Sequence, residues 1–72
     1  MYQGSQMELK DRIKILRKEK HLTMLEFGKG AKVAESTVSY WEKGRQEPNT
    51  TQRRRLCRFL GITQSELFKG VT

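Results

Sequence analysis

The spacing of apolar residues between polar ones predicts a chain made mostly of helices. In residues 6–20, Leu9, Ile13 and Leu16 recur at intervals of four and three, which places them on one face of a helix. No segment shows a sustained alternation of apolar and polar residues, so we predict no sheet. The pattern therefore indicates an all-α protein.

Four segments open with a residue pair that is typical of a helix start. In such a pair the first side chain accepts a bond from the backbone N–H three residues on, and the second side chain bonds back. The pairs are Ser5–Glu8, Thr23–Glu26, Asn49–Gln52 and Thr63–Glu66. Together with apolar spacing and glycines that end helices, they predict five helices. The expected ranges are about 6–20, ending near His21, then 24–30, 35–43, 50–60 and 64–69. The further residues expected to face the core are Leu25, Phe27, Ala31, Val38, Trp41, Leu56, Cys57, Phe59, Leu60, Leu67 and Phe68.

The length of 72 residues suits one domain. We expect residues 1–72 to form it, with a core over 6–69 and frayed ends at 1–4 and 71–72. Cys57 is the single cysteine, which rules out an intramolecular disulfide and suits a reducing compartment. No apolar run approaches the ~20 residues of a membrane span, and no signal peptide is visible. We therefore expect a cytoplasmic protein with no membrane partner.

The charge balance favours a polyanionic partner. Fifteen Lys and Arg residues face eight Asp and Glu residues, which gives a formal net charge of +7. The sequence contains no nucleophile–base pair, no clustered carboxylates and no Gly-rich phosphate loop, so we expect no enzyme and no cofactor. His21 has no other ligand at metal-binding spacing, so we expect no metal site.

Residues 22–48 are the most informative part of the chain. They predict two short helices joined by a tight turn and followed by a basic loop. The second of these helices begins with small polar residues and carries Val38 and Trp41 on its opposite side. In a chain this basic, such a helix is typical of one that enters the major groove of DNA.

Residues 9–68 resemble the helix-turn-helix domain of phage repressors and Cro-type regulators. The resemblance implies a compact five-helix bundle that contains a helix-turn-helix and binds double-stranded operator DNA. It also implies a transcription regulator of a phage lysis–lysogeny switch, acting in the bacterial host cell. The residues that carry it are Leu22-Thr23, Val33, Ser36-Thr37-Val38-Ser39, Trp41-Glu42-Lys43-Gly44, Glu47-Pro48, Leu60-Gly61-Ile62-Thr63 and Glu66-Leu67.

The resemblance also implies roles for individual residues of the second short helix and the loop after it. The candidates for contacts with base edges are Glu35, Ser36 and Tyr40. The candidates for phosphate contacts are Thr37, Ser39, Lys43 and Arg45. Two of these residues have alternatives. A glutamate at the start of a helix is also stabilised by the helix dipole, and an exposed tyrosine also suits a protein interface.

The sequence departs from the family pattern at five positions around this unit. Met24 replaces the usual Gln, Lys32 the usual turn Gly, and Gly28 the usual Ala. Ala34 replaces a capping Ser, and Arg53 an apolar residue. Met24, Lys32, Ala34 and Glu35 each weaken the usual DNA-binding surface. They favour an alternative in which the same surface, Met24 and Lys32 included, binds a partner repressor protein. The chain would then act as an antirepressor or modulator of repression. A homodimer through the last residues stays open.

Overall fold

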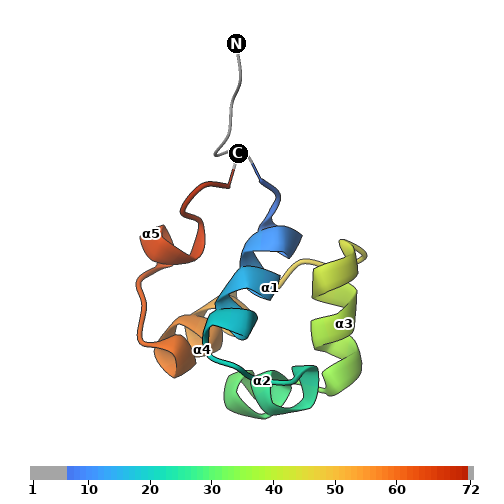
Figure 1. The fold of residues 1–72 in the computed structure, drawn as a ribbon. Helices are drawn as coiled ribbons and strands as arrows, with labels where there is room; N and C mark the ends of the chain where they lie inside the picture. Colours follow the sequence, from blue (N-terminus) through green and yellow to red (C-terminus); the bar gives the residue numbers. More distant parts are fainter. Residues whose placement is uncertain (1–6, 72) are drawn as a thin grey trace.

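The computed structural model of the protein describes residues 7–71. Its helices are α1 (Leu9–Glu19), α2 (Met24–Ala31), α3 (Glu35–Lys43), α4 (Thr50–Leu60) and α5 (Gln64–Leu67). Helix α3 lies along one side of α1, α2 lies across the bottom of the view between α3 and α4, and α5 packs on α4 at the other side (Figure 1). The described residues contain no strand beyond one isolated bridge, as the absence of apolar–polar alternation predicts. None of these helices is long and apolar enough to cross a membrane.

Three of the four predicted capping pairs mark the starts of helices. Thr23–Glu26, Asn49–Gln52 and Thr63–Glu66 each form both reciprocal bonds, with N···O distances of 2.8–3.1 Å. The fourth prediction is wrong, because α1 begins at Leu9 with Glu8 as its N-cap residue. The Glu8 N–H donates to the Asp11 carboxylate at 3.3 Å, which starts the helix three residues later than expected.

The ends of three helices also differ from the prediction. Helix α2 runs to Ala31 rather than to residue 30. Helix α1 stops at Glu19, and His21 follows in a left-handed conformation with φ of 57°. The N–H of Leu22 then bonds back to the Arg17 carbonyl at 3.2 Å and closes the turn. Helix α5 stops at Leu67 rather than at residue 69. The chain leaves helical geometry at Phe68, the C-cap residue.

The core contains the predicted apolar residues with three exceptions. Its buried members are Leu9, Ile13, Leu16, Phe27, Ala31, Val38, Trp41, Leu56, Cys57, Leu60 and Leu67. Burial raises the pKa of the Cys57 thiol. Leu25, Phe59 and Phe68 are 47%, 37% and 36% exposed, so the prediction that they face inward is wrong. Leu25 follows Met24, which packs on the core, and neighbours on a helix point about 100° apart.

The two ends of the described chain meet. Met7 and Val71 form a parallel bridge, and the Met7 N–H donates to the Gly70 carbonyl at 3.1 Å. Val71 also packs against the core, so it does not belong to a frayed end as predicted. Residues 1–6, with the predicted frayed end at 1–4 and Ser5 of the capping pair, and Thr72 lie outside the described residues. The Arg12 guanidinium donates to the carbonyls of Glu66 and Leu67, which holds the end of α5 against α1.

One largely buried ion pair joins the end of α1 to α3. Arg17 donates from Nε and Nη2 to the two carboxylate oxygens of Glu42 at 2.7 and 3.1 Å. The third donor, Nη1, bonds the Leu22 carbonyl at 2.9 Å. The Arg17 and Glu42 side chains are only 12% and 4% exposed. The hydrogen bond to Glu42 raises the pKa of Arg17. Because both charges are shielded from water, each is stabilised by the opposite charge of its partner.

Removing one member of this pair is expected to destabilise the fold strongly. Arg17→Met and Glu42→Leu should each cost about 3–5 kcal/mol, because each leaves an uncompensated buried charge. The double substitution should recover most of that loss, because it leaves no charge behind. Urea unfolding followed by circular dichroism measures the free energy of unfolding of the two single variants and the double variant. Single variants that each lose less than about 1 kcal/mol, the value of an exposed pair, would contradict this account.

Candidate nucleic-acid interface

The inner side of α3 is fixed by three side chains. Val38 and Trp41 are 0% and 1% exposed, and Glu42 turns inward to its ion pair with Arg17. These contacts leave little freedom for the helix to rotate or slide. The opposite side of α3 is therefore presented outward in a defined orientation.

The predicted site residues of α3 lie on this outer face. Ser36, Tyr40 and Lys43 are exposed and follow at intervals of four and three, so they form its central row. Ser39 is half-buried beside that row. Glu35, exposed, and Thr37, half-buried, lie at the two edges of the face. We call these six residues the outer face of α3.

The loop after α3 brings one more predicted residue beside this face. Gly44 ends the helix in a left-handed conformation with φ of 77°, which a glycine adopts without strain. The N–H of Arg45 then bonds back to the Tyr40 carbonyl at 2.9 Å. Arg45 is exposed, as is Lys43. The C-terminal end of the outer face is therefore positively charged, whereas Glu35 makes its N-terminal edge negative.

The turn between α2 and α3 is tight at two positions. A Cβ atom on Gly28 would lie 2.7 Å from the Val33 carbonyl oxygen, so even the alanine of the family pattern would force the backbone apart here. Lys32 has φ of 63°, where a side chain costs about 1 kcal/mol or more. Lys32 is exposed. The protein thus keeps a cation at a position where glycine would be less strained.

Met24 and Lys32 are not brought together. They stand at opposite ends of α2, and eight helical residues span about 12 Å. Met24 is half-buried against the core and is not the exposed apolar contact that an alternative partner surface needs. That role falls to Leu25, which the sequence analysis assigned to the core. Placing α2 on a helical wheel centred on Phe27 and Ala31 would have found it.

Two other departures from the family pattern have local structural consequences. Ala34 precedes α3 with extended backbone and forms no side-chain cap, so the first N–H groups of α3 lack a side-chain acceptor. Arg53 donates to the Pro48 carbonyl at 3.0 Å and to Thr50 Oγ1 at 3.3 Å. Its guanidinium carbon lies 6.0 Å from the Phe68 ring centroid. A cation–π contact therefore replaces the apolar contact that the usual residue would make at this position.

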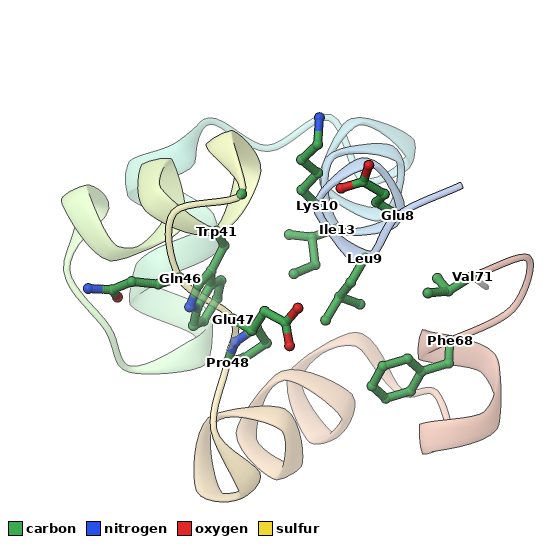
Figure 2. A pocket seen from close by; sticks show the side chains of 11 residues that line it. Glu8, Leu9, Lys10, Ile13, Trp41, Gln46, Glu47, Pro48, Phe68 and Val71 are labelled. Atoms are coloured by element: carbon green, nitrogen blue, oxygen red, sulfur yellow. The ribbon is translucent and has the colours of Figure 1, made fainter. Parts of the chain in front are cut away.

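A cavity of about 320 Å³ opens beside the loop, between the start of α1 and α5 (Figure 2). Its walls include the apolar side chains of Leu9, Ile13 and Trp41. Its rim carries Glu8 and Glu47 as well as a lysine, so its charges favour no single class of ligand. Within residues 7–71, no group of three His, Cys, Asp or Glu side chains could hold a metal ion.

Comparison with known proteins decides the family of this chain. Residues 13–69 match the profile of the helix-turn-helix family. The chain belongs to the helix-turn-helix family. This membership confirms the resemblance inferred from the sequence, and the helix-turn-helix unit is α2, the Lys32 turn and α3. A comparison with curated protein sequences gives no match.

Two solved structures resemble the whole helix-turn-helix fold. One is the solution structure of the DNA-binding domain of the P22 c2 repressor, with a TM-score of 0.81 and 28% sequence identity. The match covers 89% of this chain and 84% of that one. The other is a crystal structure of the P22 c2 repressor in complex with a synthetic operator. It has the same TM-score and identity, and the match covers 89% and 97% of the two chains.

The uncapped start of α3 gives a stability prediction. Ala34→Ser should stabilise the protein by about 1 kcal/mol, because the hydroxyl can accept an N–H of the first turn. In a domain of this size that corresponds to a rise in Tm of about 4–8 °C. Thermal unfolding measures the change in Tm. The matched control is Ala34→Val, which enlarges the same exposed side chain without adding a hydroxyl. An equal Tm for Ser and Val variants would show that the missing cap costs nothing.

Proposed function

We propose that this protein is a DNA-binding transcription regulator whose α3 enters the major groove of operator DNA. The observation that carries the proposal is the anchored α3, whose inner side is held by Trp41 and Glu42 while six residues face outward. A helix that reads base edges must be held rigidly at a defined angle, and this arrangement does so. The likeness to a repressor whose structure was solved with an operator supports the same conclusion.

Within this proposal the outer face divides into two sets of contacts. Ser36 and Tyr40 lie in the central row and are suited to base edges, with Glu35 at the margin of the groove. The cations Lys43 and Arg45 lie at the opposite end and are suited to phosphates, which position the protein without reading sequence. Thr37 and Ser39 add neutral phosphate donors. A homodimer would place two copies of α3 on half-sites about 34 Å apart.

The proposed setting is the lysis–lysogeny switch of a temperate phage, in the cytoplasm of the host bacterium. The structural likeness to the P22 c2 repressor supports this setting. The net charge of +7 supports a polyanionic ligand of the kind that an operator provides.

A second candidate function is modulation of a partner repressor through the helix-turn-helix surface. The observation that favours it is the exposure of two large apolar side chains on that unit, Leu25 at 47% and Tyr40 at 40%. Exposed aromatic and aliphatic residues are enriched where proteins meet, whereas phosphates gain little from Leu25. The acidic Glu35 at the edge of the same face also opposes DNA phosphates.

The phosphate contacts give the first test. A dimer making about three phosphate contacts per monomer should show a log–log salt slope near −5. Lys43→Gln and Arg45→Gln should weaken binding to all operator sequences alike and reduce the slope by about 1 per lost contact. Fluorescence anisotropy at several salt concentrations measures this. The control is Lys14→Gln, which removes one positive charge from an exposed position of α1. A control variant that lost as much affinity as Lys43→Gln would contradict specific phosphate contact.

Glu35→Gln separates the two candidate functions. If α3 enters a groove with Glu35 beside the backbone, removing the charge should strengthen DNA binding several-fold, because a phosphate repulsion is relieved. The variant and the wild type are titrated with operator-sized DNA. Each is also mixed with a candidate repressor, chosen as any repressor-type protein encoded beside the gene, and sedimented in an analytical ultracentrifuge. A stable heteromer together with DNA binding that stays weak in both forms would favour the modulator. Absence of any heteromer would count against it.

A further inference from the structure

A second hollow, of about 260 Å³, lies where the end of α2 meets the last turns of α4. We call it the basic hollow; its lining residues are Gly30, Lys32, Arg55, Arg58 and Phe59. Its floor is apolar, because the Phe59 ring lies directly against the backbone of Gly30. A Cβ atom on Gly30 would lie 2.2 Å from that ring, so a larger residue would fill the space that the ring occupies.

The Phe59 ring is held in place rather than free to swing away. It meets Phe27 edge-to-face, with ring centroids 6.0 Å apart and an interplanar angle of 74°. Phe27 itself is fully buried. Even so, Phe59 remains 37% exposed to solvent. A packed and partly exposed aromatic ring at the bottom of a hollow provides a preformed binding surface for another apolar group.

Three cations surround this floor and no acidic side chain lines it. Lys32, Arg55 and Arg58 are all exposed. Within the part of the chain that the structure describes, none of the three forms a side-chain hydrogen bond or an ion pair. Lys32 also occupies a left-handed conformation that favours glycine. Three positive charges therefore lie around an apolar floor, and no described acidic side chain pairs with any of the three.

We propose that the basic hollow docks an acidic segment of a partner protein. One aromatic or aliphatic side chain of that segment rests on Phe59, and flanking carboxylates pair with Lys32, Arg55 and Arg58. Charge complementarity selects an acidic partner, and the apolar floor favours a peptide side chain over the backbone of duplex DNA. A duplex phosphate would use the cations but would leave the Phe59 ring without a partner. This docking site goes beyond the proposed function, because it needs neither the outer face of α3 nor DNA.

The test uses the intact protein and a short fluorescent peptide in which one Phe is flanked on both sides by Asp and Glu. The wild type should bind this peptide about tenfold more tightly than the same peptide with Ser in place of Phe, because the ring contact is lost. Arg55→Gln with Arg58→Gln should weaken binding about tenfold, because two charge pairs are removed. The matched control, Lys14→Gln with Lys18→Gln, removes the same charge from exposed positions of α1 and should change affinity less than about twofold.

Two further measurements identify where the peptide binds and separate this site from DNA binding. Amide chemical shifts should move around Lys32 and Phe59 and not along the outer face of α3. Affinity for operator DNA should change equally in the two double variants. Equal peptide loss in both double variants, equal affinity for the Phe and Ser peptides, or no saturable binding by the wild type would overturn the proposal. A selective loss of DNA affinity in the Arg55/Arg58 variant would instead make these residues phosphate contacts and also overturn it.

Discussion

The orientation of the helix-turn-helix depends on the buried pair between Arg17 and Glu42. This pair joins the last turn of α1 to the inner side of α3, and the third Arg17 donor bonds the Leu22 carbonyl in the segment that leads to α2. One guanidinium therefore fixes three parts of the fold at once. Such pairs stabilise a protein less than their short distances suggest, because both charges lose their hydration. Their contribution here is geometric, because the two bonds between Arg17 and Glu42 orient α3 against α1.

Much of the fold is encoded in short-range signals that a single sequence displays. The capping pairs at Thr23, Asn49 and Thr63 mark helix starts because both partners lie within one turn of each other. Gly44 and Gly61 mark helix ends for an equally local reason, since they adopt positive φ without strain. The start of α1 shows the limit of such signals, because its N-cap residue is Glu8, whose N–H bonds the Asp11 carboxylate.

The remaining features depend on contacts between residues far apart in sequence. The pairing of Met7 with Val71 and the bonds from Arg12 to the end of α5 have no local pattern that predicts them. The exposure of Phe59 follows from its position over Gly30, which is nearly thirty residues away and which sequence spacing does not connect to it. The outer face of α3 was easier to predict, because Val38 and Trp41 define its inner side within one helix. Its contacts with a ligand stay a prediction.

The separation between the two sides of α3 has a consequence for how this surface can change. Every group that holds the helix in place points inward, whereas Ser36, Tyr40 and Lys43 make no described contact that the fold requires. Substitutions along that row can accumulate without passing through unfolded intermediates. A population of such chains can therefore explore new targets at little risk to folding, and a designer can transplant another protein's recognition residues onto the same scaffold.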